Sequence, residues 1–252
     1  MAWSKLYEKD KKEPFKLSRT KIENFIKCPR CFYLDRKLGI AQPPGFPFTL
    51  NSAVDTLLKK EFDIYRAKQK IHPLMDHYGL KAVPFRNEKI NEWRENFVGV
   101  QYLHAPTNFL IFGAVDDVWI NENQELMVVD YKATSSEEKP TLDAEYRQAY
   151  KRQMEIYQWL LRKNGFKVSS TGYFVYANGK KDLEAFDGKL EFDVDLLDYT
   201  GDDSWVEKIL LDIKKCLDSD NIPLTASRIE RIREDGGDPF GAYQIPRAAL
   251  AL

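Results

Sequence analysis

The chain is predicted to fold as an α/β protein, with a mixed β-sheet flanked by helices and a helical region before the sheet. Two patterns predict this arrangement. Apolar residues recur at helical spacing within residues 18–68, whereas residues 98–134 alternate as β-strands do. A strand, a helix and a second strand then follow one another between residues 125 and 176. The 252 residues are enough for one large domain or two small ones.

The helical region begins after a polar, Lys-rich segment, residues 1–17, which is expected to form a flexible arm. Ser18 is predicted as the N-cap of a short helix, because its side chain can accept a hydrogen bond from the exposed amides of the first turn. Cys28-Pro29 interrupts this helix. The following predicted helices cover residues 30–37 and about 50–68.

The strand region is predicted as an antiparallel meander followed by the strand, helix and strand unit. Residues 71–95 have mixed signals and receive no firm assignment. The predicted strands cover residues 98–104, 109–120, 125–134, 171–176 and 189–196. The later predicted helices cover about residues 143–163 and 204–217.

Composition places the chain among globular proteins but leaves its function open. Hydrophobic residues make up 43% and charged residues of both signs 31%. A net charge of -1 does not indicate a general phosphate binder, which usually has a basic excess. The chain shows no run of membrane-spanning length and no secretory signal at its start, so we expect a cytoplasmic protein with reduced cysteines.

Acidic residues in two neighbouring strands form the first candidate site. Asp130 and Lys132 are two apart in a predicted strand and therefore point to one side. A three-residue loop at 122–124 would place Asp116 opposite Asp130, whereas a four-residue loop would shift the pairing. Two facing carboxylates destabilise a sheet by up to about 1 kcal/mol unless a cation lies between them.

A hard divalent ion would suit these oxygen ligands and keep several waters. It would activate water and neutralise phosphoryl charge, while Lys132 would orient the water or stabilise the developing negative charge. The alternative is that Asp116 and Asp117 are solvated strand residues and that Asp130 and Lys132 form a surface ion pair.

Three short motifs stand in this part of the chain: Gly113-Ala-Val-Asp116, Val128-Val-Asp130-Tyr-Lys132 and Gln153-x-x-x-Tyr157. They resemble the RecB-like branch of the PD-(D/E)XK nuclease superfamily, which includes CRISPR-associated adaptation nucleases and helicase-linked exonucleases. Residues 18–34 also resemble the opening helix of that branch. The resemblance spans about residues 18–217 and implies a restriction-endonuclease-like fold, with a helical part at 18–95, a catalytic core at 96–220 and a tail at 221–252.

The resemblance also implies roles for single residues. Asp116 and Asp130 correspond to metal ligands, Tyr131 to a ligand through its main-chain carbonyl, and Lys132 to the catalytic lysine. Asp55 stands where many relatives have a ligand histidine; its oxygen still suits Mg²⁺ or Mn²⁺, although it would equally fit a solvent-facing helix position.

The Gln153 and Tyr157 side chains are four residues apart on one helix face and are expected beside the site and DNA. Without the hairpin motif, Tyr157 would be interpreted as core and Gln153 as solvated. Arg147 and Lys151, on the same helix, are candidate phosphate contacts or members of a solvated face. The other basic residues considered for this role are Lys139 and Arg152.

Some relatives hold an iron-sulfur cluster, but the three cysteines of this chain are fewer than the four thiolates that the usual cluster needs, so none is expected. Cys28, Cys31 and Cys216 would likewise leave a zinc site without a fourth ligand, and the C-x-x-C is interpreted as a buried helix-end feature.

Together these features predict a DNA nuclease that depends on Mg²⁺ or Mn²⁺ and acts as an exonuclease. The alternative is a degenerate nuclease-fold module that binds nucleic acid or a partner protein. The chain has no Walker phosphate loop, so any helicase would be a separate subunit.

Overall fold

The structure is a computed structural model that describes residues 6–41, 43, 49–144 and 147–224. Its internal contacts divide the chain into two compact units. The first unit comprises residues 1–45, 103–111 and 204–252, and the second comprises residues 46–102 and 112–203. These units interleave along the sequence, whereas the expected parts, 18–95 and 96–220, are contiguous.

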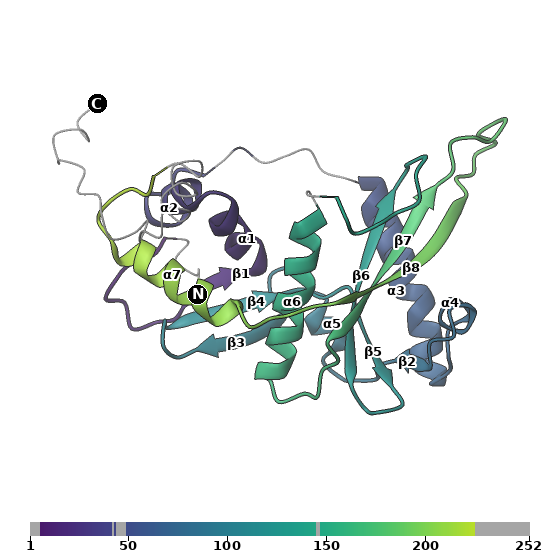
Figure 1. Cartoon of the computed structure of the whole chain (residues 1–252), viewed down its shortest axis with the longest axis horizontal. Coiled ribbons are helices and arrows are strands. Elements are labelled where there is room, and N and C mark those ends of the chain that lie inside the picture. The colour runs from purple at the N-terminus through teal and green to yellow at the C-terminus, as the bar shows by residue number, and fades with distance from the viewer. Residues whose placement is uncertain (1–5, 42, 44–48, 145–146, 225–252) are drawn as a thin grey trace. The chain divides into compact units, whose positions relative to one another are not determined.

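The first unit contains the helices that the sequence predicts near both ends of the described chain. Ser18 caps its first helix, with its hydroxyl accepting a hydrogen bond from the Lys21 amide at 3.3 Å, as predicted. Part of the segment expected as an arm belongs to this unit: Tyr7 is buried and donates to Asp218 at 2.5 Å, and Phe15 lies in a strand. The elements of this unit are β1 (Phe15–Ser18), α1 (Arg19–Lys27), α2 (Pro29–Lys37) and α7 (Val206–Asp218) (Figure 1).

The C-x-x-C motif joins α1 to α2. Cys28 ends the first helix and caps the second, where its sulfur accepts a hydrogen bond from the Cys31 amide at 3.1 Å. The motif is therefore at helix ends, as predicted, but its two cysteines are half-buried and not buried. Cys28 and Cys31 form a disulfide, so the expectation of three reduced cysteines is wrong for this pair.

The second unit is built on a five-stranded mixed sheet with the order β2-β5-β6-β7-β8. Only the β6 and β7 pair among its described ladders is parallel. The sheet strands are β2 (Ala82–Pro84), β5 (Asp117–Asn121), β6 (Leu126–Thr134), β7 (Thr171–Gly179) and β8 (Phe192–Thr200). The helices are α3 (Thr49–Lys68), α4 (Pro73–His77), α5 (Ile90–Trp93) and α6 (Gln148–Lys163). The predicted α/β class with a mixed sheet and flanking helices is confirmed.

Two helices cover opposite faces of this sheet. Tyr131 of β6 stacks on Phe62 of α3, with ring centroids 5.7 Å apart. The preceding residue, Asp130, accepts a hydrogen bond from Gln153 of α6 at 2.6 Å. Because successive side chains of a strand point to opposite faces, α3 and α6 lie on the two sides of β6.

The predicted strand over residues 109–120 is two strands that belong to different sheets. β4 (Phe109–Gly113) pairs in a three-stranded sheet of order β1-β4-β3, with β3 at Val100–His104, whereas β5 lies in the five-stranded sheet. Between them the Val115 amide donates to the Trp93 carbonyl at 3.1 Å, which interrupts the ladder. The predicted meander is therefore wrong, because the chain changes sheets at residues 114–116.

Candidate active site

A pocket forms where β5 stops pairing with β6. β5 begins at Asp117, which pairs with Val129, while β6 continues beside β7 as far as Thr134. Beyond Val129 this edge of β6 has no partner among the described strands, and there the Tyr131 amide donates to the Asp116 carboxylate at 2.8 Å. The predicted hairpin register is confirmed for the paired residues, and Asp116 immediately precedes the strand.

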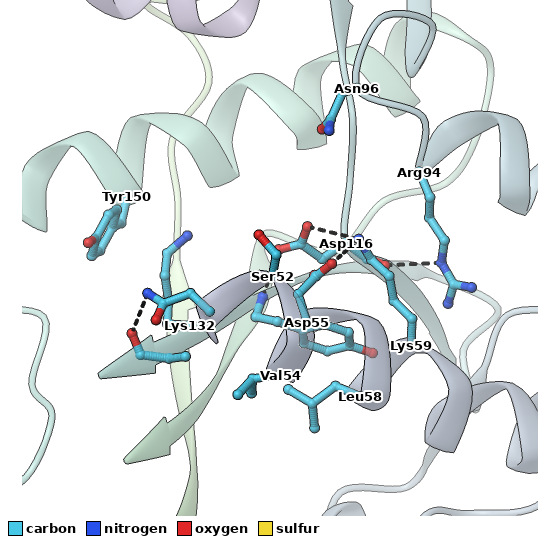
Figure 2. A pocket seen from close by; sticks show the side chains of 13 residues that line it. Ser52, Val54, Asp55, Leu58, Lys59, Arg94, Asn96, Asp116, Lys132 and Tyr150 are labelled. Atoms are coloured by element: carbon cyan, nitrogen blue, oxygen red, sulfur yellow. Dashed lines mark hydrogen bonds and ion pairs between the residues drawn. The ribbon is translucent and has the colours of Figure 1, made fainter. Parts of the chain in front are cut away.

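The pocket has a volume of about 510 Å³ and is lined by α3, α6, β6 and the segment around Asp116 (Figure 2). All its lining residues belong to the second unit. The lining contains two carboxylates and three cationic side chains, which are Asp55, Asp116, Lys59, Arg94 and Lys132.

Asp55 and Asp116 are brought together around one ammonium group. The Lys59 Nζ lies 2.8 Å from Asp55 Oδ2 and 3.6 Å from Asp116 Oδ1 (Figure 2). Burial raises the pKa of Asp55 and the charge of Asp116 raises it further, against the opposing effect of Lys59. Asp55 lines the pocket with a side chain that is 33% exposed, and its role as a metal ligand stays a prediction.

Asp130 and Lys132 form an ion pair inside the protein. Asp130 is 0% exposed, so the alternative of a surface ion pair is wrong. The Lys132 Nζ also lies 4.5 Å from the centroid of the Tyr150 ring. Burial lowers the pKa of Lys132, but the charges of Asp130 and Asp116 outweigh it and leave that pKa raised, so the ammonium stays protonated.

The glutamine and tyrosine of the α6 motif are directed at Asp130. Gln153 donates to Asp130 Oδ1 at 2.6 Å and to the Tyr157 hydroxyl at 3.3 Å. Both side chains are interior, because Gln153 is 8% and Tyr157 3% exposed. Gln153, bonded to Tyr157, holds the carboxylate in place, and the expected position of both side chains beside DNA stays a prediction.

A family model described as the PD-(D/E)XK nuclease superfamily matches residues 16–228. The chain belongs to this superfamily. Members are nucleases that generally use divalent metal ions, so the pocket with its two aspartates and lysine is the candidate active site of a nuclease-type hydrolase.

A solved structure titled "Crystal structure of SSO0001" is 16% identical, with a TM-score of 0.34, and the match covers 81% of this chain and 77% of that chain. No curated protein matches the chain. Among the described residues of this nuclease-family protein, no helix is both long and apolar enough to cross a membrane.

The residues present fit a divalent ion by their chemistry. Asp55 and Asp116 supply carboxylate oxygens, the donors that Mg²⁺ and Mn²⁺ prefer, and Lys59 already places a cation between them. Within the described ranges no three His, Cys, Asp or Glu side chains converge closely enough to hold a metal. Asp130, bonded to Gln153 on the α6 side, is therefore not gathered with the other two.

The two basic residues predicted as phosphate contacts lie near aromatic rings of the same unit. The Arg147 guanidinium carbon is 5.7 Å from the Tyr176 ring centroid, and the Lys151 Nζ is 5.6 Å from that of Tyr199. Both side chains are partly exposed, and neither lines the pocket.

A buried charge network beside the candidate site is not predicted from the sequence. Asp117 is fully buried and accepts hydrogen bonds from Arg66 at 2.5 Å, Arg94 at 3.1 Å and the Tyr131 hydroxyl at 2.8 Å. The interpretation of Asp117 as solvated is therefore wrong. Arg66 follows the buried Phe62 by four residues on α3, a spacing that could have indicated an inward-facing arginine.

The same network reaches the main chain of the site. Arg94 donates to both oxygens of Asp63, at 3.0 and 2.9 Å, and its Nε donates to the Asp116 carbonyl at 3.1 Å. Since Arg94 is fixed by Asp63 and Asp117, it fixes in turn the backbone that presents the Asp116 carboxylate.

Proposed function

We propose that this protein hydrolyses phosphodiester bonds of DNA in the pocket that contains Asp116 and Lys132, with Mg²⁺ or Mn²⁺ bound there. The observation that supports this most directly is the pairing of Asp55 and Asp116 around a cationic group, with Lys132 in the same pocket. Two carboxylates can hold a divalent ion, and an ammonium group can stabilise the negative charge that develops on the phosphoryl group.

The proposed metal ligands are Asp55, Asp116 and the Tyr131 carbonyl, and the family resemblance adds Asp130, whose carboxylate is held by Gln153 and Lys132. In a strand the amide and carbonyl of one residue point to the same side. Because the Tyr131 amide faces Asp116, its carbonyl faces the pocket edge too. A bound ion would lower the pKa of a coordinated water and neutralise phosphoryl charge.

The lining contains cations that an anionic substrate could contact. Lys59, Arg94 and Lys132 line the pocket with Asp55 and Asp116, but Arg94 is paired with Asp63 and Asp117, and Lys132 with Asp130. A bound divalent ion would therefore supply the positive charge that attracts a phosphodiester to a chain with a net charge of -1. Lys132, kept protonated beside Asp130, can donate to the negative charge that develops on the phosphoryl group.

Residues of α6 would act in two ways. Gln153, backed by Tyr157, would hold the Asp130 carboxylate through its amide and so act as a positioning residue. Lys151 on the same helix and Arg147 at its N-cap, both partly exposed, would contact phosphates along the strand of DNA.

The test compares cleavage by wild type, Asp130→Asn and Lys132→Met on end-labelled DNA and RNA, with EDTA or with added Mg²⁺ or Mn²⁺. We expect metal-dependent cleavage of DNA and a loss of at least ~100-fold in both variants, since each removes a charge that acts on the reacting phosphate. Asp193→Asn is the control, because its side chain is 67% exposed on β8. Cleavage at the wild-type rate by both variants would contradict the proposed active site.

The resemblance to the RecB-like branch further predicts exonuclease action. Linear DNA should be degraded while a closed circle of the same sequence remains intact, and rapid cutting of the circle would show an endonuclease. DNA retained on the protein with Mn²⁺ but never cut would indicate the alternative, a module that binds without catalysis.

A further inference from the structure

We infer that Lys59 is the resident counter-cation of the pocket and competes with the divalent metal for Asp55 and Asp116. This inference rests on the proposed function, and it adds an intramolecular control over metal loading. Asp55 and Lys59 are four residues apart on α3, so one helix face presents both a carboxylate and its competitor.

The contacts of Lys59 are those of a shared counter-ion. Its Nζ lies 2.8 Å from Asp55 and 3.6 Å from Asp116, residues that come from distant parts of the chain. The Lys59 side chain is only 21% exposed, so water screens these charges less than it does on an open surface. A surface pair between neighbours on one helix would not involve Asp116.

Charge balance determines what Lys59 can do. One ammonium compensates one of the two carboxylates, whereas a divalent ion compensates both. Lys59 nevertheless competes at high effective concentration, because it is held on the same helix as Asp55. Metal that binds must displace the ammonium and then tolerate a positive charge beside it.

Removing the charge of Lys59 should therefore strengthen metal binding through both the metal-free and the metal-bound state. The metal-free protein loses the cation between Asp55 and Asp116, which raises its free energy. The metal-bound protein loses a repulsive neighbour, which lowers its free energy. Both changes strengthen metal binding, so Lys59 sets the free metal concentration at which the site fills.

The experiment titrates Mn²⁺ calorimetrically into full-length wild type, Lys59→Met, Lys59→Arg and Lys60→Met. Methionine removes the charge while keeping an unbranched chain. Lys60 is the matched control, since it is the next residue on α3, is exposed and does not line the pocket. We expect Lys59→Met to bind Mn²⁺ at least ~10-fold more tightly than Lys60→Met, and Lys59→Arg to bind as wild type does.

Thermal unfolding in EDTA provides a readout that needs no metal. Lys59→Met should melt below Lys60→Met in EDTA, and added Mn²⁺ should narrow the difference. Tight binding by Lys59→Met alone would also support the inference, because it would show that the ammonium excludes the metal from wild type.

Three results would overturn the inference. If wild type binds Mn²⁺, with loss of binding in Asp116→Asn, and Lys59→Met binds no more tightly, the proposed metal site stands and the role of Lys59 fails. If Lys59→Arg gains as much affinity as Lys59→Met, charge is not the cause. If no variant binds Mn²⁺, the proposed function fails together with the inference.

Discussion

At the scale of single residues, the most demanding feature is Asp117, a fully buried carboxylate shared by two arginines and a tyrosine. A buried charge is tolerated only when its partners compensate its desolvation. Because Arg94 also bonds to the Asp116 carbonyl, the stability of the unit and the geometry of the site depend on the same group.

Asp117→Asn should destabilise the protein by ~3–5 kcal/mol, because it removes the negative charge that compensates the buried guanidinium groups of Arg66 and Arg94. Urea unfolding at pH 7 measures the loss. Asp193→Asn, on an exposed side chain, should change stability by no more than ~0.5 kcal/mol. Equal stability of the two variants would contradict the role assigned to Asp117.

Asp63 makes the network sensitive to pH. Burial alone would raise its pKa, but hydrogen bonds from Arg94 and Arg66 outweigh burial and leave the pKa below its ordinary value. A carboxyl group with a lowered folded-state pKa stabilises the protein above its unfolded-state pKa, and this contribution is lost as the pH falls through the folded-state pKa.

Wild type should therefore have a larger free energy of unfolding than Asp63→Asn at pH 7. This difference in free energy should decrease below the ordinary carboxyl pKa of 3.8. Urea unfolding of both proteins at several values between pH 7 and pH 3 checks this. A gap that stays constant over that range would show that the charge of Asp63 contributes nothing.

At the scale of elements, the sequence predicts local features better than changes of sheet. The Ser18 cap and the register between Asp117 and Val129 depend on nearby residues and are correct. The break before β5 was missed because non-polar residues continue without interruption from Phe109 to Val115. What interrupts the strand is the hydrogen bond from Val115 to the distant Trp93, which no local pattern reveals.

The site follows the same rule. The motifs identify Asp116, Asp130 and Lys132, and the structure shows Asp116 and Lys132 lining one pocket with Asp130 paired to Lys132. The sequence does not reveal that Lys59 lies between Asp55 and Asp116. This contact joins α3 to Asp116, which directly precedes β5 and is distant from α3 in the sequence. Spacing predicts neighbours on an element but not neighbours between elements.

The cysteines allow a test of α1, α2 and α7. Burial raises the pKa of the Cys216 thiol to about 12, and Cys28 and Cys31 are joined. Native protein at pH 8 should therefore resist iodoacetamide, denatured protein should take up one label, and denatured, reduced protein three. Intact mass measures the labels, and a label on native Cys216 would contradict its burial.

At the scale of the whole molecule, the two units interleave along the chain, which limits where it can be divided. A fragment of residues 96–220 would correspond to the expected catalytic core but would lack α3 and β2. The buried cluster beneath the sheet would then lose three of its nine buried members, Phe62, Met75 and Ala82. Losing one large core side chain costs ~3–5 kcal/mol, and a domain has only ~5–15 kcal/mol of stability.

The fragment 96–220 should therefore lack a cooperative urea transition and near-ultraviolet dichroism, whereas residues 46–203 should keep both, because they contain every segment of the second unit. The longer fragment also retains Asp55 and Lys59 of the pocket. A cooperative transition in fragment 96–220 would show that the sheet is stable without α3, and would place the boundary of the folded core where the sequence predicts it.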